Sequence, residues 1–343
     1  MATTNRHIQL GHGGGGRLSQ QLLNDLLVPA LGPRNGVLHD AARLVSPGMQ
    51  LAFTTDSYVV RPLVFPGGDI GRLSVFGSVN DLAMAGARPL AMSLGLIIEE
   101  GLKITCLKEI VASINEACTQ VGVPVITGDT KVVERGKGDG LFINTSAIGV
   151  VEHNLRIDPA NVEPGDVVLV SGDLGRHGLA ILVAREELKL RSELESDLAC
   201  LLEPVQSLLN NGLTPHCLRD LTRGGLASAV DEIARSSGCR ILLDEETIPA
   251  HPMVKGACEL LGLDVLSMAN EGRMLLICPP QQAIETLTVL RRLCPGAARI
   301  GVVGERLSTQ TVLEMRYPVS LISSLGVARP LDLGSGEQLP RIC

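Results

Sequence analysis

The sequence predicts a fold of two α+β domains, and three observations lead to this expectation. The chain has 343 residues, enough for about two domains of ordinary size. Expected strands and helices are mixed along it, but strands often follow strands, which favours α+β units over a doubly wound parallel sheet. A stretch rich in proline, glycine and aspartate, "DPANVEPGD" at 158–166, separates two halves that have a similar order of elements.

The first half contains apolar runs whose spacing predicts strands and helices. A helix at 105–122 is expected because Ile110, Ile114 and Ala117 fall on one stripe and Gly122 can end it. The segments 123–133 and 141–151 are expected to pair as neighbouring strands across the turn "ERGKGDG". The other elements expected in this half are a strand at 51–56, a helix at 71–87 and a strand at 89–98.

The second half opens with a buried strand expected at 167–172. Further helices are expected at 178–189, 196–210, 224–238, 252–262 and 282–293, and further strands at 240–246, 273–279, 298–305 and 311–315. After about residue 332 the periodicity ends, and "LGSGEQLPRIC" is expected to be a mobile tail. The expected divisions are a glycine-rich segment 1–40, an N-terminal domain 41–155, a C-terminal domain 156–331 and the tail 332–343.

The composition excludes several classes of protein. Hydrophobic residues make up 45% of the chain, ample for two cores, whereas aromatic residues make up only 2%. The formal net charge is −7 and there is no basic block, so we expect no nucleic-acid surface and no surface for anionic membranes. The first residues lack an apolar signal core, and no apolar run reaches the ~20 residues of a membrane span. The chain is therefore expected to be soluble and cytoplasmic.

Nine cysteines occur in the chain, and one of them is unlike the others. Their number is odd and no two form a CxxC pair, so neither a disulfide framework nor a zinc knuckle is expected. Most lie among apolar neighbours, as in "LLICPP", and are expected to be small core residues. Cys343 is the exception because it is the last residue of the expected tail.

A run of glycines, "GHGGGG" at 11–16, precedes an expected helix. It matches the dinucleotide-binding pattern through Gly11, Gly13 and Gly16, but "HIQL" before it is a poor strand and no parallel βαβ unit is expected after it. Arg17 and Leu18 stand where a Walker A loop needs Lys and Ser or Thr. Two interpretations remain, a flexible arm and a flap that covers phosphate with its backbone amides.

Four aspartates stand in apolar or glycine-rich surroundings, where a single buried carboxylate is costly unless it is paired or bound to a metal. They are Asp56, Asp81, Asp129 and Asp220. Each alone could be a helix cap or half of an ion pair. Together they indicate a site for a cation and a phosphate, and Mg²⁺ suits them because it needs only one or two carboxylates besides substrate phosphates.

Three further positions carry polar groups that suit such a site. Asp129 and Lys131 are two apart on an expected strand and so face the same side, although they could be only a surface pair. Thr222 precedes an expected helix, either as an anion-binding residue or as an ordinary cap. Glu271 stands just before a buried strand, as an acid or base or as a turn carboxylate paired with Arg273. These signals favour an enzyme that uses a Mg²⁺–nucleotide complex, but they do not name the reaction.

Taken together, seven segments resemble the HypE family of hydrogenase maturation proteins, within the aminoimidazole ribonucleotide synthetase superfamily. They are "TTDSYVVRPLVFPGGDIGRLSVFGSVNDLAMAGARPL", "LIIEEG", "VITGDTKVVERG", "LFINTSAIG", "RDLTRGGLAS", "CELLGLDVLSMANEGR" and the terminal "PRIC". The resemblance spans essentially the whole chain, and the combination with "PRIC" at the end is very specific.

The resemblance implies the aminoimidazole ribonucleotide synthetase-like fold of two α+β domains, with dimerisation through the sheet of the N-terminal domain. It implies that ATP and Mg²⁺ bind between the glycine-rich segment, including Gly13 and Gly14, and the four aspartates. It also implies that Cys343 is a carrier thiol and that Lys131 and Glu271 act in a dehydration. Less firmly assigned residues of the same motifs are Asn80, Thr222 and Arg223.

The activity implied by the resemblance is ATP-dependent dehydration of a carbamoyl group on the chain's own C-terminal cysteine. In this family the carbamoyltransferase HypF loads the cysteine, and the product is a thiocyanate. The cyano group then passes to iron on a HypC–HypD complex during assembly of the [NiFe]-hydrogenase site. Two alternatives stay open: another ATP-dependent enzyme of the superfamily, such as a small-molecule kinase or synthetase, and a non-catalytic maturation scaffold.

Two positions depart from the family pattern. Family members often carry an acidic residue where Arg61 stands, and they commonly read "GDHG" where this chain reads "GRHG", with Arg176 before His177. A nucleotide or cation contact made by that acidic residue would have to be made otherwise here. His177 is expected to be a histidine of a surface loop and is not counted among the site residues.

Overall fold

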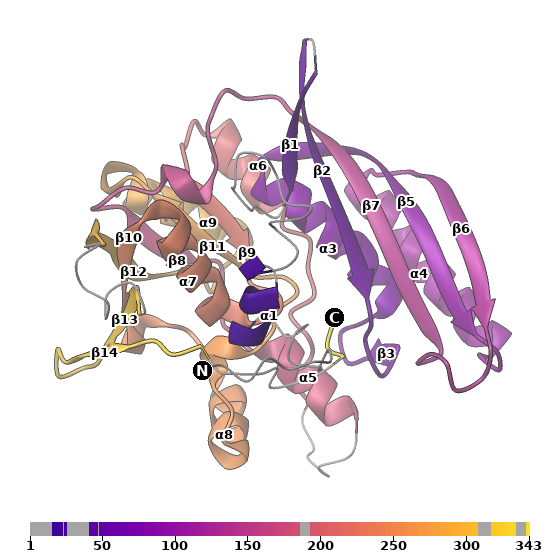
Figure 1. Ribbon diagram of the computed structural model, residues 1–343. Helices are drawn as coiled ribbons and strands as arrows, with labels where there is room; N and C mark the ends of the chain where they lie inside the picture. The colour runs from indigo at the N-terminus through magenta and orange to yellow at the C-terminus, as the bar shows by residue number, and fades with distance from the viewer. Residues whose placement is uncertain are drawn as a thin grey trace.

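The computed structural model describes residues 16–22, 24–25, 41–46, 48–185, 193–307, 317–333 and 341–343. Gly13, Gly14 and the strand expected at 311–315 lie outside these residues. Two sheets with their helices form the two halves of the molecule, as predicted (Figure 1). In the described part of the chain, no helix is both long and apolar enough to cross a membrane.

The N-terminal half is built on a five-stranded sheet in the order β1-β2-β7-β5-β6. Its strands are β1 (Ala42–Ser46), β2 (Met49–Tyr58), β5 (Ala87–Glu99), β6 (Val125–Val133) and β7 (Leu141–Val151). Helices α3 (Ile70–Met84) and α4 (Ile104–Val121) lie against one face of the sheet (Figure 1). As expected, Ile110, Ile114 and Ala117 are the buried stripe of α4, and Gly122 caps this helix in the left-handed conformation.

The prediction that β6 and β7 pair as neighbouring strands is wrong. Strand β6 pairs in parallel with β5, and β7 lies between β5 and β2, antiparallel to both. Helix α4 crosses from the end of β5 to the start of β6, as a parallel pair requires. The seven-residue turn at 134–140 is longer than a tight hairpin needs. Strand β6 lies at the edge of the sheet, and its residues are exposed along nearly its whole length.

Helix α3 is buried on nearly every side, which explains its lack of a polar face. It contacts β2, β5 and β7 of its own half and also α6 (Leu202–Asn210) and β9 (Cys217–Asp220) of the other. Its first turn is capped by Asp69, whose Oδ1 accepts from the backbone N–H groups of Gly71 and Arg72. The helix therefore joins the two halves and brings Asp81 to their junction.

The C-terminal half is built on a seven-stranded sheet in the order β14-β13-β10-β12-β8-β11-β9. Besides β9, its strands are β8 (Val167–Val170), β10 (Cys239–Asp244), β11 (Met274–Cys278), β12 (Ala298–Arg306), β13 (Val319–Ile322) and β14 (Ala328–Pro330). Its helices besides α6 are α5 (Arg176–Ala184), α7 (Gly225–Ser237), α8 (Pro252–Leu261) and α9 (Ala283–Leu293).

Shorter elements complete the fold. They are α1 (Arg17–Leu22), the two-stranded ribbon of β3 (Val64–Phe65) and β4 (Gly68–Asp69), and 3-10 turns at Pro159–Asn161, Glu245–Thr247, Val265–Ser267 and Pro280–Gln282. The helix expected at 196–210 begins only at Leu202, because the N–H groups of Ala199 and Leu201 bind Glu271 and Asn80 instead of a preceding helical turn. The C-terminus lies at this junction, near α5 and β3 (Figure 1).

Candidate active site

A pocket at the junction of the two halves gathers most of the residues that the sequence singled out. From the N-terminal half it is lined by Thr54, Thr55, Asp56, Ser57 and Tyr58 of β2 and by Gly77 and Asp81 of α3. From the C-terminal half it is lined by Asp220, Thr222, Arg223 and Glu271, and the last residue of the chain, Cys343, also lines it. Carboxylates from four separate segments thus face one space together with a thiol.

Strand β2 presents three polar side chains on one face through its two-residue period. Thr54, Asp56 and Tyr58 alternate with exposed Thr55 and Ser57. Thr54 Oγ1 donates to Asp81 Oδ2 at 2.5 Å, and Tyr58 Oη donates to Asp56 Oδ2 at 3.0 Å. These bonds orient the carboxylates of Asp56 and Asp81.

Tyr58 stays a hydrogen-bond donor because its ionised form is disfavoured. Burial and the nearby Asp56 carboxylate hold the pKa of the Tyr58 phenol well above its usual range. Thr54 and Tyr58 are not among the residues predicted for the site, although their alternation with Asp56 in "TTDSY" is a sequence signal for them.

Glu271 is a strongly perturbed carboxyl group of the pocket. Its side chain is buried, and Oε1 has no hydrogen-bond partner among the described residues. Burial raises its pKa well above the usual range, and the carboxylates of Asp220, Asp197 and Asp56 raise it further, whereas Arg223 lowers it. A carboxylate made more basic in this way can act as a general base.

The pocket carboxylates do not form a ready-made metal centre. In the described part of the chain, no group of three or more His, Cys, Asp or Glu side chains is placed to hold a metal ion. The unpartnered Oε1 of Glu271 and the mutual repulsion of the acidic groups nevertheless fit a cation that arrives with phosphates, because Mg²⁺ usually keeps several water and phosphate ligands.

The last three residues of the chain are docked in this site. The backbone N–H of Val59 donates to the Cys343 O at 3.1 Å, and that of Arg61 donates to the Arg341 O at 3.2 Å. Ile342 is only 3% exposed and belongs to the hydrophobic core of the N-terminal half. The end of the tail expected to be mobile is thus held against β2 and the segment that follows it.

The other cysteines have surroundings that suit the core role predicted for them. None of the nine forms a disulfide. Burial raises the pKa of Cys200, Cys258 and Cys278 to about 11, so these thiols stay protonated at neutral pH.

Asp129 and Lys131 face the same side of β6, as predicted, but they do not line the pocket. Lys131 Nζ lies 3.2 Å from Asp129 Oδ2, and each side chain is 71% exposed. The pair lowers the pKa of Asp129, chiefly through the hydrogen bond from Lys131. Within one chain these two residues form a surface ion pair on the edge strand.

Asn80 does not line the pocket, and its side chain links two segments of the backbone. Its Nδ2 donates to the Ala199 carbonyl at 3.0 Å, and its Oδ1 accepts from the Leu201 N–H at 2.7 Å. Because its amide binds the backbone on both sides, Asn80 fastens α3 to the segment before α6.

The two departures from the family pattern are both accommodated by carboxylates. Arg176 Nε lies 2.5 Å from Asp173 Oδ2, and Arg61 Nη1 lies 3.7 Å from Asp139 Oδ1.

The prediction that His177 lies in a surface loop is wrong. This residue is fully buried, with Nδ1 2.8 Å from Ser196 Oγ and Nε2 2.7 Å from the Ile342 carbonyl oxygen. The docked tail covers it, and no local sequence signal marks that contact.

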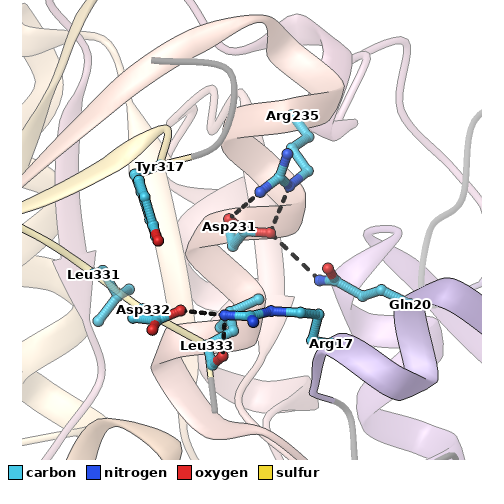
Figure 2. Close-up of a pocket in the computed structure, with 8 residues that line it drawn as sticks. All are labelled: Arg17, Gln20, Asp231, Arg235, Tyr317, Leu331, Asp332 and Leu333. Atoms are coloured by element: carbon cyan, nitrogen blue, oxygen red, sulfur yellow. Dashed lines mark hydrogen bonds and ion pairs between the residues drawn. The ribbon is translucent and has the colours of Figure 1, made fainter. Parts of the chain in front are cut away.

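A second pocket lies between α1, α7 and the start of the tail, and Figure 2 shows that its charged side chains pair with one another. Arg17 Nη2 lies 2.5 Å from Asp332 Oδ1 and 3.2 Å from the Leu333 carbonyl, while Asp231 binds Arg235 at 2.7 Å. This pocket is therefore a weaker candidate for catalysis. It does fasten α1, which follows the glycine run, beside the start of the tail.

Comparisons with known proteins identify the family. The domain families described as AIR synthase related protein, N-terminal domain and C-terminal domain, match residues 38–151 and 163–313. A relative from Rhodobacter capsulatus, named carbamoyl dehydratase HypE, is 44% identical, with 100% of both chains covered. Another of that name, from Cupriavidus necator, is 47% identical and covers 98% of this chain and 95% of its own.

Two solved structures are similar along nearly the whole chain. A chain in a crystal structure of a HypE–HypF complex has a TM-score of 0.83 at 39% identity, covering 91% of this chain and 99% of its own. A crystal structure of HypE in complex with ATP has a TM-score of 0.81 at 43% identity, covering 98% and 100%. This chain, with its two matching domains and its full-length relatives, belongs to the HypE family of carbamoyl dehydratases.

Proposed function

We propose that the chain uses ATP to dehydrate a carbamoyl group carried on its own Cys343, leaving a thiocyanate at that sulfur. The observation that carries the proposal is the position of Cys343, which lines the same pocket as Asp56, Asp81, Asp220 and Glu271. The thiocyanate would supply the cyanide ligand of a [NiFe]-hydrogenase iron.

The pocket carboxylates are the proposed ligands of the nucleotide's cation. Mg²⁺ held by Asp56, Asp81 or Asp220 would offset the negative charge of the phosphates. Thr222 and Arg223 line the pocket just before α7 and are proposed to contact phosphate oxygens. Gly13 and Gly14 stay proposed phosphate ligands. A HypE structure solved with ATP supports the nucleotide.

The reaction needs a leaving group and a base. The carbamoyl oxygen attacks the terminal phosphorus of ATP, the bond from that phosphorus to ADP breaks, and one N–H proton leaves. The carbon–oxygen bond then breaks with loss of the second N–H proton, which gives S–C≡N and phosphate. Glu271 is the proposed base because its surroundings raise its proton affinity.

The chemistry can be tested by intact-mass measurement. Carbamoylated protein given Mg²⁺ and ATP should lose the mass of one water, and the loss should map to Cys343. Glu271→Gln should slow the loss by about two orders of magnitude or more, as expected when a general base is removed. An unchanged mass in the native chain would refute the proposal, as would the same loss in Cys343→Ala.

We propose that the chain works as a homodimer formed through its N-terminal sheet. Large apolar side chains of this sheet are exposed, among them Phe53, Ile97, Ile126 and Val132. Such a surface supports burial against a second copy. Lys131 is exposed on β6 and does not line the pocket of its own chain. It would therefore stabilise phosphate in the pocket of the neighbouring subunit, and its ion-pair partner Asp129 would enter that pocket with it.

Mixed dimers test whether Lys131 acts across the interface. Lys131→Ala and Cys343→Ala should each be inactive alone. An equal mixture should regain up to about half of the native activity per intact Cys343, because random exchange puts roughly half of the chains in mixed dimers. If the mixture stays inactive although exchange is verified by mass, Lys131 does not act in trans.

The proposed partners follow from the family. HypF is the proposed donor of the carbamoyl group, and a relative's structure in a HypE–HypF complex supports it. A HypC–HypD complex is the proposed acceptor of the cyano group, and the cytoplasm is the proposed location of these steps.

A further inference from the structure

Hydrogen bonds and an ion pair hold the docked end of the chain at each of its last three residues. Arg341 Nη1 donates to both carboxylate oxygens of Asp139, at 2.8 and 3.0 Å, and Arg185 Nη2 donates to the Arg341 carbonyl at 2.6 Å. His177 binds the Ile342 carbonyl. We call His177, Ser196, Arg185 and Asp139 the tail receptor.

The hydrogen bonds around His177 are compatible with only one arrangement of protons on a neutral ring. The Ile342 carbonyl can only accept, so Nε2 carries the hydrogen. Nδ1 must then accept, and the Ser196 hydroxyl donates to it at 2.8 Å. Ser196 Oγ in turn accepts from the Leu198 N–H at 3.1 Å. Each group in this series has a role that its neighbour fixes.

The ring is held rigidly and stays neutral. Phe65 lies edge-on to it, with ring centroids 5.4 Å apart and planes at 87°. Burial lowers the pKa of His177 to about 4. A rigid donor with a fixed tautomer defines the position of the carbonyl that it binds, and that carbonyl belongs to the residue before Cys343.

The backbone of the tail also shows that these contacts hold it in a particular shape. Arg341 has a φ of 56°, in the left-handed region that a non-glycine residue enters only at an energetic cost. The ion pair with Asp139 and the bond from Arg185 compensate for this conformation. The receptor thus stabilises a bend that turns Ile342 into the core and Cys343 into the pocket.

We infer that His177, fixed in one tautomer by Ser196, is a positioning residue that docks the Ile342 carbonyl and so places the Cys343 thiol in the pocket. This inference deepens the proposed function and rests on it only for the chemistry that follows docking. The docking itself requires neither ATP nor a carbamoyl group.

The first test measures the reactivity of Cys343 with iodoacetamide, followed by peptide mass spectrometry of the full-length protein. His177→Ala should raise the alkylation rate of Cys343 about tenfold, because a lost buried hydrogen bond of about 1.4 kcal/mol shifts the docked fraction by that factor. His216→Ala is the matched control, since the imidazole of His216 binds Asp166 and not the tail. Cys106 gives an internal reference. An unchanged Cys343 rate in a folded His177→Ala protein overturns the inference.

The second test leaves His177 in place. ¹⁵N NMR of the native chain should show His177 as the tautomer protonated at Nε2. In a chain ended after residue 340, the His177 signals should shift while those of His216 stay unchanged. A His177 ring protonated at Nδ1, or signals unaffected by the truncation, would overturn the inference even if His177→Ala failed to fold.

Kinetics then separate positioning from chemistry. With carbamoylated protein, His177→Ala should slow single-turnover dehydration about tenfold, because the thiol of a tail that still docks is no longer held in line with the groups of the pocket. The ATP concentration that gives half the maximal rate should not change. His177→Gln should recover part of the rate, because its amide can donate to the same carbonyl. If the alkylation and NMR results hold but no dehydration occurs in any chain, the docking role stands and the proposed reaction falls.

Discussion

Glu271 is the residue whose surroundings most affect the proposed chemistry. A buried carboxyl group near Asp220, Asp197 and Asp56 holds its proton more tightly than an exposed one. A general base must be ionised to accept a proton. Activity should therefore rise with pH only at pH values above the usual pKa range of a glutamate side chain, and we call this part of the pH profile the rising limb. Two neighbours allow the limb to be moved in opposite directions.

Asp197→Asn removes a negative neighbour, so the pKa of Glu271 should fall and the limb should move to lower pH. Arg223→Met removes the positive neighbour, so the limb should move to higher pH. The measurement is the single-turnover dehydration rate against pH at saturating ATP. Shifts of the same sign in both variants would exclude Glu271 as the titrating base.

Glu271 should also lower the stability of the folded protein at neutral pH. The pKa of Glu271 is raised in the folded state, so the cost of burying its ionised carboxylate is absent below the pKa of the unfolded chain. As the pH rises from there through the folded-state pKa, this cost appears and the free energy of unfolding falls. Glu271→Gln lacks this penalty and should melt higher at pH 7, by about 2–4 °C for each kcal/mol gained. The difference should vanish near pH 4. Melting curves without nucleotide or Mg²⁺ give the comparison, and a lower melting temperature at pH 7 would contradict it.

At the scale of elements, α3 shows how a buried helix shapes the pocket. A Cβ added at Gly77 would lie 2.3 Å from Tyr58 Oη and 3.1 Å from two carbons of its ring. The absence of a side chain at Gly77 therefore permits the Tyr58 hydroxyl to reach Asp56.

Gly77→Ala should destabilise the protein by about 1–3 kcal/mol, because overpacking outweighs the better helix propensity of alanine. Adding Tyr58→Phe removes the closest clashing atom and should recover part of this loss, although the ring carbons remain close. Urea unfolding of the two single variants and the double variant measures the coupling. Additive effects would show that Gly77 and Tyr58 do not interact.

Element patterns also explain which parts of the fold could be predicted. Helix α4 was predictable because its apolar stripe and Gly122 are local features. The order of β5, β6 and β7 was not, because it depends on which strands meet through long-range pairing. The exposed pattern of β6 becomes informative only once its edge position is known.

At the scale of the whole molecule, the site is assembled from segments distant in sequence. Asp56, Asp81, Asp220 and Glu271 could be singled out because each carboxylate stands in unusual local surroundings. His177 could not, since its partner Ile342 lies 165 positions away and nothing in "GRHG" indicates burial. Placement of Asp129 and Lys131 outside the pocket likewise follows from the sheet order and not from any local motif.

The docking of the chain's own end makes the tail an intramolecular ligand. A tethered group occupies its site at an effective concentration in the millimolar range, so a free molecule of similar affinity competes poorly. A synthetic peptide ending in Arg-Ile-Cys should therefore bind a chain ended after residue 340, as measured by calorimetry, and bind the full chain far more weakly. Equal binding to both would show that the tail leaves its site open. Selective inhibitors of this pocket face the same competition, because each protein molecule carries its own occupant.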